Sequence, residues 1–404
     1  MAGGPLEGVR IVDLTQAVVG PLATQIMADH GADVIKVESK EGDLIRFLAG
    51  KSITPAMGPK FLHLNRNKRS VVLDLKQPSG HAALLKLIAQ ADVFMWNVRP
   101  AAIERLKLSY ADVKKINPKI VYCGMFGFGQ GGRYRDKPAY DNAIQGLGGL
   151  AALNHRATGE PRYMPLVVAD KVVGLTTVQM IAMALYRRCT TGEGCSIQIP
   201  MFENVAKFVL EDHMYLQTFE PPLGGTGDQR LLDPLGKPVP TKDGWICVSA
   251  NTNKQVFALF EAIGRPELKE DPRFASVAKR FANVKEYFEL RNERIKDKTT
   301  AEWLEIFDRR GVPAMPYNTL EDLLVDPHLA DVGLFEIKDH PTEGKIRNIR
   351  PPNEWSCGTR REWIPAPKIG QQSVEILREV GCSEVEIDRM IAEGATLDGS
   401  VRPH

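Results

Sequence analysis

The sequence predicts a doubly wound α/β fold, and two observations carry this prediction. Over residues 1–130, short runs rich in Val and Ile alternate with segments that have the period of a helix. Regular alternation of such strands with helices indicates a parallel sheet that is covered on both faces. The chain has 404 residues, of which 43% are hydrophobic and 25% are charged, so it is long enough for about two or three globular domains.

Each expected element has a local signal of its own. The first expected helix, for example, has Pro21 near its start and Gly31 just past its end, where these residue types are favoured. Strands are expected at 9–14, 32–38, 70–75, 92–98, 119–126 and 195–201. Helices are expected at 20–31, 79–91, 101–108, 110–116, 171–188 and 202–217.

Composition changes near Pro221, where a segment rich in Gly and Pro predicts a linker or an exposed loop. A strand at 244–251 and charged helices within 253–310 are expected next, followed by a second boundary after Pro313. Strands at 334–339 and 345–350 and a helix pair within 373–394 complete the chain. We therefore expect a large domain over 1–220, a small domain over 221–330 with its flanking linkers, and a C-terminal segment over 331–404.

Charge and cysteine content restrict the function classes. A formal net charge of +2 is too near zero to indicate a nucleic-acid or membrane surface, so local basic groups must hold any anionic partner. Six scattered cysteines without a C-x-x-C pair favour reduced, mostly buried thiols over a disulfide framework or a zinc site. The N-terminus lacks the basic and apolar regions of a secretory signal, and the longest apolar stretch, 172–186, is shorter than the roughly 20 residues of a membrane span. We expect a cytoplasmic protein.

The carboxyl ends of the expected strands mark a candidate ligand site, because open α/β sheets bind ligands beyond that edge. The segments there are 15–20, 38–40, 75–76, 97–99 and 127–129, with Arg105 about two turns beyond Asn97. Their backbone amides and few cationic side chains predict a site for an elongated anion. Gly127, Gly129 and Gly132 match the G-x-G-x-x-G pattern of nicotinamide-dependent oxidoreductases, but no helical period follows, so a flexible turn is favoured.

One carboxylate, Asp170, stands in the otherwise apolar stretch "PLVVADKVVGL", just before a helical pattern. It can cap that helix by accepting a hydrogen bond from the amide of Val172 or Val173. The same position suits a nucleophile, because a helix N-terminus keeps a carboxylate ionised while apolar surroundings strip its water and raise its pKa. The residues by themselves leave both interpretations open.

A family resemblance is carried by six segments that are spread in order over nearly the whole chain. They are "LEGVRIVDLTQAVVGPLATQIMADHGADVIKVES", "NRNKRSVVLDLKQPSG", "NPKIVYCGMFGFGQGG", "PAYDNAIQGLGGL", "GVPAMPYNTLEDLLVDPHLADVGLF" and "PAPKIGQQSVEILREVG". This series closely resembles the class III CoA-transferase family. The resemblance implies an interlocked homodimer, in which each protomer has a small domain and a large Rossmann-like domain that contains both terminal segments. It also implies acyl-CoA and a small carboxylic acid as substrates, with no metal and no redox cofactor.

By this resemblance Asp170 is the catalytic nucleophile. It attacks the thioester of a donor acyl-CoA to give a mixed anhydride, the CoA thiolate converts this anhydride to an aspartyl-CoA thioester, and an acceptor carboxylate then reverses the sequence. The CoA contacts carried over from the family are Gln16, Ala17, Val18, Val19, Ser39, Lys40, Leu73, Leu75, Lys76, Asn97, Val98, Arg99, Arg105, Lys137 and Tyr140. Backbone amides near Gln16 and Ala17, or in the glycine-rich loops, are expected to stabilise the oxyanions.

Departures from the family pattern concern the phosphate contacts and the lid. The formyl-CoA type has an aromatic residue at the position of Val98, an Arg at that of Ser39, and a run of four glycines that is missing here. Candidates for a shorter lid or for oxyanion binding are Gly224, Gly225 and Gly227. Oxalate is therefore disfavoured as the acceptor.

Two other functions compete with CoA transfer. The α-methylacyl-CoA racemase type pairs its aspartate with a histidine, whereas Tyr140 stands at that position here and His155 lies outside the motif. A non-catalytic acyl-CoA-binding protein would bind CoA without exchanging it. For a transferase, the basic residues Arg46, Lys51 and Arg66 favour a dicarboxylate, with succinyl-CoA as the donor.

Overall fold

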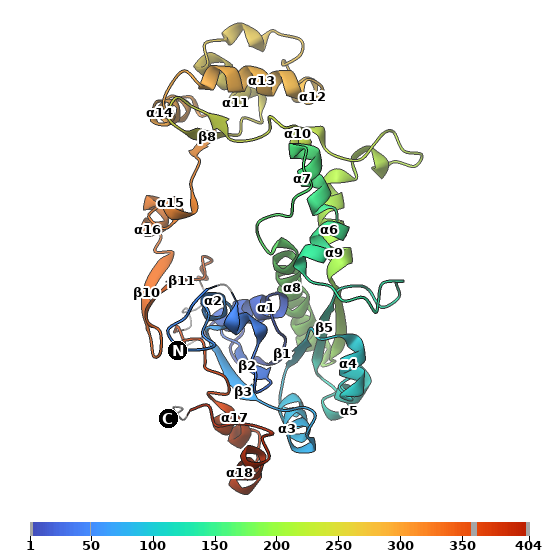
Figure 1. The fold of residues 1–404 in the computed structure, drawn as a ribbon. Coiled ribbons are helices and arrows are strands. Elements are labelled where there is room, and N and C mark those ends of the chain that lie inside the picture. The colour runs from blue at the N-terminus through green and yellow to red at the C-terminus, as the bar shows by residue number, and fades with distance from the viewer. Residues whose placement is uncertain (1–2, 49, 357–361, 401–404) are drawn as a thin grey trace. The chain divides into compact units, whose positions relative to one another are not determined.

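The computed structural model describes residues 3–48, 50–356 and 362–400, which form two compact units (Figure 1). Unit 1 comprises Met1–Gly148, Pro165–Lys207 and Gly333–His404, and unit 2 comprises Gly149–Met164 and Phe208–Val332. The sequence analysis placed 149–164 within the large domain. These residues belong to unit 2 because helix α7 (Leu150–Thr158) packs against α10 (Gln229–Leu232), a long-range contact without a local sequence signal.

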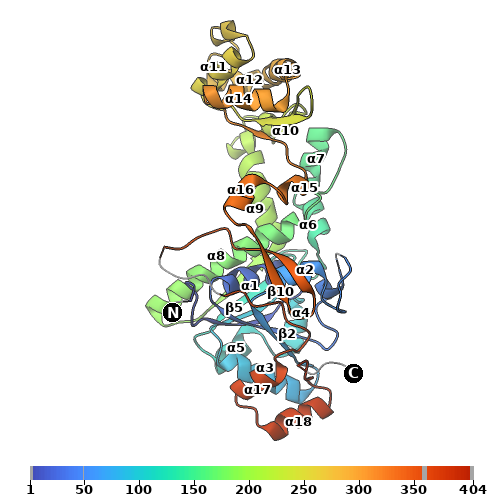
Figure 2. The same cartoon turned by 90° about the vertical axis from the view of Figure 1, so that its left-hand side faces the viewer.

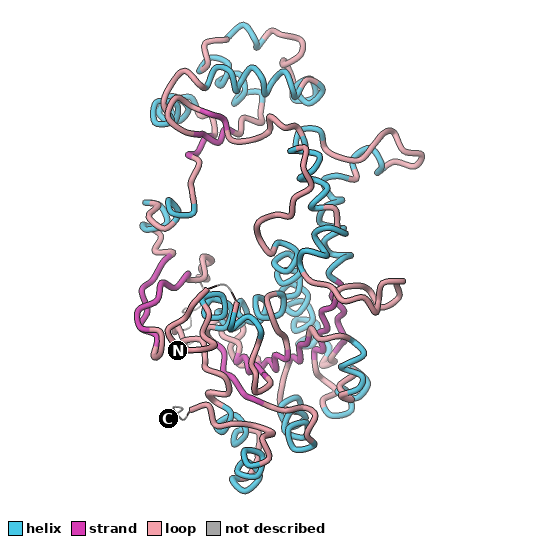
Figure 3. The backbone as a smooth tube through the Cα atoms, in the orientation of Figure 1, coloured by secondary structure: helices cyan, strands magenta, loops and turns pink. Residues whose placement is uncertain are grey.

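Unit 1 is built on a six-stranded sheet in which every neighbouring pair of strands is parallel, as the sequence predicts (Figure 3). The strand order is β3-β2-β1-β4-β5-β6. The strands are β1 (Arg10–Leu14), β2 (Asp33–Glu38), β3 (Lys68–Val72), β4 (Val93–Trp96), β5 (Val121–Phe126) and β6 (Cys195–Pro200). All residues of β4 and β5 are buried, which explains their continuous apolar runs.

Helices cover both faces of this sheet, which makes the fold doubly wound (Figures 1 and 2). On one face lie α1 (Val19–Asp29), α2 (Pro59–Asn65) and α8 (Val168–Thr191). On the other lie α3 (Pro78–Ala89), α5 (Tyr110–Ile116) and α17 (Ser373–Glu379). The core on this second side joins Leu87, Val113 and Ile376, so the C-terminal segment contributes to the same core as the N-terminal one.

The remaining elements of unit 1 connect or flank the sheet. They are the 3₁₀ helix η1 (Leu44–Phe47), α4 (Pro100–Arg105), α6 (Asp141–Leu147), the antiparallel pair β10 (Phe335–His340) and β11 (Gly344–Ile349), and α18 (Glu384–Ala392). Helix α9 (Met201–His213) begins in unit 1 and ends in unit 2. The short helices α2 and α6 were not predicted from the sequence, and β3 begins two residues and ends three residues before the strand expected at 70–75.

Unit 2 has its own core, in which helices pack on a small antiparallel sheet of order β7-β8-β9. The strands are β7 (Val239–Pro240), β8 (Trp245–Val248) and β9 (Ala314–Pro316). The helices after β8 are α11 (Asn253–Ala262), α12 (Val277–Ala282), α13 (Val284–Ile295), α14 (Thr300–Arg310), α15 (Leu320–Leu323) and α16 (Pro327–Asp331), and two 3₁₀ turns, η2 (Tyr215–Thr218) and η3 (Pro266–Lys269), complete the unit. Buried Phe260, Trp303 and Phe307 anchor these helices.

Two expectations about the whole chain need correction. Of the five cysteines in described residues, only Cys123 and Cys382 are buried, so the thiols there are not mostly buried; Cys357 lies outside the described residues. In the described part of the chain, α8 passes the length and composition test for a membrane-crossing helix, because it runs for 24 residues rather than over 172–186 alone. Core helices of globular proteins pass the same test, and α8 packs along α1.

A network of buried charges lies beneath the carboxyl end of β1. Lys36 donates hydrogen bonds to Asp43 Oδ2 at 2.8 Å and to the carbonyl of Thr15 at 2.9 Å, and the side chains of Lys36 and Asp43 are fully buried. Lys68, also fully buried, lies 3.4 Å from Asp13. Buried ions persist only when paired, so this network fixes the position of the chain that leaves β1.

We predict that Lys36→Met destabilises the protein by about 3 kcal/mol or more, because it leaves Asp43 buried without its cation. Urea denaturation of the full chain measures the change. Lys40→Met, which removes an exposed lysine from the turn after β2, should change stability by no more than about 0.5 kcal/mol. A loss of less than about 1 kcal/mol for Lys36→Met would show that the pair does not hold this region together.

Candidate active site

A cavity of about 740 Å³ opens in unit 1 beyond the carboxyl ends of β1, β4 and β5. The chain leaves β1 toward β2 on one side of the sheet and leaves β4 toward β5 on the other, so this is the switch point at which doubly wound folds bind ligands. Seven predicted CoA contacts line the cavity, namely Gln16, Ala17, Asn97, Val98, Arg99, Lys137 and Tyr140.

The other predicted contacts do not line this cavity. Ser39, Lys40, Leu73, Leu75 and Lys76 follow β2 and β3 at the same edge of the sheet, where Leu73 is buried, Leu75 half-buried and the other three exposed. Val18 and Val19 are buried at the start of α1, and Arg105 is exposed at the end of α4.

The loop after β1 is held from both sides. Asn97 accepts a hydrogen bond from the amide of Gln16 and donates one to its carbonyl, both at 2.8 Å. The amide of Ala17 donates to Asp43 Oδ1 at 3.0 Å, and Ala17 has a φ of +64°, a strained value for a residue with a Cβ. Because both amides already have acceptors, the expectation that they bind an oxyanion is wrong for this conformation.

Asp170 is the third residue of α8, so it is not the helix cap. The N-cap position is Val167, which has no side chain able to accept a hydrogen bond. The acceptor is instead Asp141 of α6, whose Oδ1 accepts the amide N–H of Asp170 at 3.1 Å and whose Oδ2 accepts from Gln145 at 2.6 Å. The sequence-based capping interpretation is therefore wrong, and the carboxylate of Asp170 is not needed to hold the helix.

Burial, and to a lesser extent the neighbouring charge of Asp141, raises the pKa of Asp170 from 3.8 to about 7, although the charge of Lys60 opposes the shift. The apolar surroundings come from the start of α8, where Val167 packs on a cluster that contains Val18, Ile45 and Phe61. A carboxylate with a raised pKa is more basic, and so a better nucleophile, whenever it is ionised.

Asp170 does not itself line the cavity, but two residues near it directly adjoin lining residues in the chain. Tyr140, which lines the cavity, directly precedes Asp141, the acceptor for the amide of Asp170. Val18, in the cluster that receives Val167, directly follows Ala17 of the cavity wall. Asp170 is therefore linked to the cavity through residues that directly adjoin its lining residues in the chain.

The groups around Asp170 do not form a racemase pair. The titratable side chains that shift the pKa of Asp170 are Asp141 and Lys60. Tyr140, which stands at the position of the racemase histidine, is 74% exposed. His155 lies on α7 in unit 2 rather than in a loop, and it is exposed. Proton transfer on two faces of a substrate needs a second acid or base, and Tyr140 is not among the described groups that shift the pKa of Asp170.

Several other sequence-based candidates have structural roles or lie elsewhere. Arg46 and Arg66 are buried in ion pairs with Glu38 and Asp29, at 2.7 and 2.6 Å, so the suggestion that they select a dicarboxylate is wrong; Lys51 is exposed. The glycine-rich loop at 127–132 continues without a helix until α6, which confirms the turn and removes the nicotinamide interpretation. The candidate lid residues Gly224, Gly225 and Gly227 belong to unit 2.

Asp141 and Lys60 are the functional residues that the sequence analysis missed. Asp141 opens the run "DNAIQGL", and an acidic residue before such a run is a helix-start signal that could have been used. Lys60 follows Pro59 at the start of α2, but nothing in the sequence indicates that its charge acts on Asp170.

Comparisons with known proteins all point to one family. A family model described as CoA-transferase family III matches residues 6–373. A succinyl-CoA:glutarate CoA-transferase from Mus musculus is 33% identical over 398 residues, 96% of this chain and 90% of the relative. A succinate–glutarate CoA-transferase from Agrobacterium fabrum is 30% identical, over 93% of this chain and 96% of the relative. The crystal structure of a CAIB/BAIF family protein from Brucella suis covers 94% of this chain and 100% of its own, with a TM-score of 0.77 at 29% identity.

We predict that Asp170→Asn stabilises the protein above neutral pH. The folded-state pKa of Asp170, about 7, lies above the unfolded value near 3.8, so wild-type stability falls as pH rises through this window. The asparagine of the variant does not ionise, so the stability of the variant should not fall in this window. Its free energy of unfolding should equal that of wild type near pH 4 and exceed it at pH 8 by about 2 kcal/mol, allowing for partial solvent exposure.

Urea denaturation at the two pH values measures the difference. Asp388→Asn, which changes an exposed carboxylate on α18, should show no such dependence. A stability difference between wild type and Asp170→Asn that is the same at both pH values would contradict the raised pKa.

Proposed function

The chain belongs to CoA-transferase family III and is an enzyme that transfers CoA, and from this premise we propose which residues and substrates the reaction uses. Asp170 is the nucleophile. The observation that carries this proposal is a carboxylate with a raised pKa in the first turn of α8, whose hydrogen-bond partner Asp141 directly follows Tyr140 of the cavity at the switch point of the sheet. Because Asp141 accepts the free amide at the start of α8, the two carboxylate oxygens of Asp170 are not used to cap the helix and can take part in the reaction.

The proposed reaction is a series of acyl transfers. A carboxylate oxygen of Asp170 attacks the thioester carbon, the C–S bond breaks, and CoA leaves as a thiolate from a mixed anhydride. The thiolate then attacks the aspartyl carbon and expels the donor acid, which leaves an aspartyl-CoA thioester. The acceptor carboxylate attacks this thioester, and the released thiolate finally attacks the new acyl carbon, which frees Asp170. Acyl transfer of this kind needs neither a metal nor a redox cofactor.

CoA is proposed to bind in the cavity of unit 1. Arg99, Arg135 and Lys137 line it, and they supply cations of the kind that hold phosphate groups. The loop at Gln16 and Ala17, fixed by Asn97 and Asp43, forms a rigid wall against which the pantetheine arm can be positioned. Lys40 and Lys76, exposed at the same edge of the sheet, extend this basic surface.

The proposed substrates are succinyl-CoA and a small dicarboxylic acid such as glutarate. Support comes from two relatives at 33% and 30% identity whose names state succinate or succinyl-CoA and glutarate, each matched over most of its length. Lys60, whose charge acts on Asp170, supplies a cation in unit 1 for a second carboxylate beside the reacting one. Gly224, Gly225 and Gly227 are proposed as the lid.

We also propose that the active form is a homodimer. Leu175, Met183 and Tyr186 of α8 are 51%, 57% and 74% exposed in the single chain, and their spacing places them on one side of the helix. Large apolar side chains grouped in this way mark protein contacts. A cytoplasmic location remains a prediction.

We predict that Asp170→Ala lowers acyl exchange by at least about 10³-fold, because no other group in the proposed scheme forms the covalent intermediates. The full chain is incubated with succinyl-CoA and a panel of carboxylic acids, and new acyl-CoAs are identified by mass spectrometry. Glutarate should be converted faster than monocarboxylic acids of similar length. Asp388→Ala serves as the control and should keep wild-type exchange; exchange at the wild-type rate by Asp170→Ala would refute the mechanism.

We predict a mass of twice 44.8 kDa in light scattering during gel filtration. Met183→Glu combined with Tyr186→Glu places charges in the apolar face of α8 and should shift the protein toward the monomer. Ala111→Glu, at an exposed position of α5 on the other face of the sheet, should leave the dimer intact. A monomeric wild type would contradict the proposal.

A further inference from the structure

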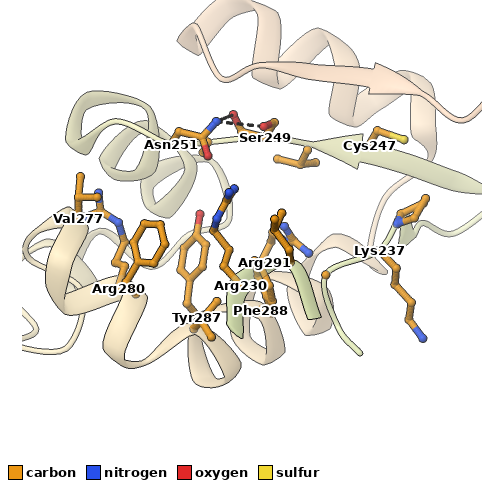
Figure 4. Close-up of a pocket in the computed structure, with 17 residues that line it drawn as sticks. Arg230, Lys237, Cys247, Ser249, Asn251, Val277, Arg280, Tyr287, Phe288 and Arg291 are labelled. Atoms are coloured by element: carbon orange, nitrogen blue, oxygen red, sulfur yellow. Dashed lines mark hydrogen bonds between the residues drawn. The ribbon is translucent and has the colours of Figure 1, made fainter. Parts of the chain in front are cut away.

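Unit 2 contains a cavity of about 350 Å³ that the proposed reaction does not use. Its walls come from β8 and the residues after it, and from α12 and α13 (Figure 4). Arg230 and Tyr287 point across the cavity toward the strand end that carries Ser249 and Asn251 (Figure 4). The volume is about half that of the cavity in unit 1, and it lies at the small end of the range for ligand sites.

The charge of this cavity is one-sided. Arg230, Lys237, Arg280 and Arg291 line it, and none of its 17 lining residues is acidic. Across the whole chain, basic and acidic residues nearly balance, with 52 Lys and Arg against 50 Asp and Glu. Four cations around one cavity without a carboxylate therefore produce a local positive potential that attracts anions.

Two of these guanidinium groups are buried with neutral partners. Arg280 donates to the carbonyl of Phe274 and to Asn253 Oδ1, both at 2.7 Å, and Arg291 donates to Asn292 Oδ1 at 3.0 Å and to the carbonyl of Leu235 at 3.3 Å. Among the described residues, no carboxylate pairs with either group. Burial lowers the pKa of both arginines, as expected for charges without an ionic partner, and a bound anion would offset the cost of burying them.

Arg230 provides a hydrogen-bond donor that could bind an anion. Its Nε is buried and has no hydrogen-bond partner within the described chain, and its one ion pair, with Asp228, is long at 3.9 Å. A buried donor without an acceptor is costly. The guanidinium fork of arginine matches the oxygens of a carboxylate or a phosphate, so an oxyanion in the cavity would satisfy it.

We propose that this cavity is a binding site for a small organic anion, whose carboxylate or phosphate oxygens pair with Arg230 and Arg291 and whose body packs on Tyr287 and Phe288. The aromatic wall already stacks with one of the cations, since the guanidinium of Arg291 lies 4.5 Å from the centre of the Phe288 ring. Burial raises the pKa of Tyr287, so its hydroxyl stays protonated and can donate. The site belongs to unit 2, whereas Asp170 belongs to unit 1, and the proposal is independent of the reaction assigned to Asp170.

Calorimetric titration of the full chain in the absence of acyl-CoA tests the proposal with three probes: inorganic phosphate, glutarate and adenosine monophosphate. At least one probe should bind with a Kd in the millimolar range or below. The double variant Arg230→Gln, Arg291→Gln should weaken that binding at least about tenfold, because it removes the paired cations. Comparison of the phosphate and glutarate arms identifies which oxyanion the site takes.

Arg294→Gln is the matched control, because it removes the same charge from an exposed position on α13 and should change the Kd less than about twofold. The proposal is overturned if no probe binds, or if the double variant binds as tightly as Arg294→Gln does.

A second measurement uses only the wild-type chain, so the result cannot be caused by a variant that fails to fold. Cys247 lines the cavity and is partly exposed, whereas Cys189 is exposed on α8 in unit 1. In the wild-type chain, the bound probe should slow alkylation of Cys247 by iodoacetamide at least about threefold and leave Cys189 unchanged, with both read by peptide mass spectrometry. Equal labelling of Cys247 with and without the probe would overturn the site.

Discussion

The buried ion pair between Lys36 and Asp43 is the constraint on which the candidate active site depends. Lys36 holds the carbonyl of Thr15, and Asp43 holds the amide of Ala17, so one pair fixes both ends of the turn that leaves β1. Asn97 at the end of β4 fixes the residue between them. Ala17 keeps its strained φ only because these partners over-determine it, and the result is a rigid wall at the switch point of the sheet.

Two carboxylates have separate roles at the start of α8, where Asp141 accepts the amide of Asp170 and the pKa of Asp170 is raised. A helix start needs an acceptor for its free amides, and an aspartate there would ordinarily serve that need and lie flat against the backbone. Asp141 takes over as the acceptor from a neighbouring helix, and its charge also raises the pKa of Asp170. Two neighbours limit the cost of placing two carboxylates close together. Gln145 donates a hydrogen bond to Asp141, and the charge of Lys60 opposes the rise in the pKa of Asp170.

The parallel sheet could be predicted because its strands are buried on both faces and therefore read as continuous apolar runs. The rule that ligands lie beyond the carboxyl ends of such strands then located Gln16 and Asn97 at the cavity, whereas Tyr140 was located only by the family resemblance. The other contacts of the site could not be predicted, because their partners are separated in the sequence. The acceptor for the amide of Asp170 lies 29 positions earlier, and Arg46, which suggested a substrate contact, is neutralised by Glu38 in the core. Neither pairing has a local pattern, since each forms only when separate elements pack together.

The central claim is that Asp170 carries the acyl group covalently, and chemical trapping tests it most directly. The full chain is mixed with succinyl-CoA and quenched with hydroxylamine, which converts an aspartyl anhydride or aspartyl thioester to a hydroxamate, and the peptides are then examined by mass spectrometry. We predict a hydroxamate at Asp170 that requires succinyl-CoA. A hydroxamate at another residue, or exchange that proceeds with none formed, would contradict the account.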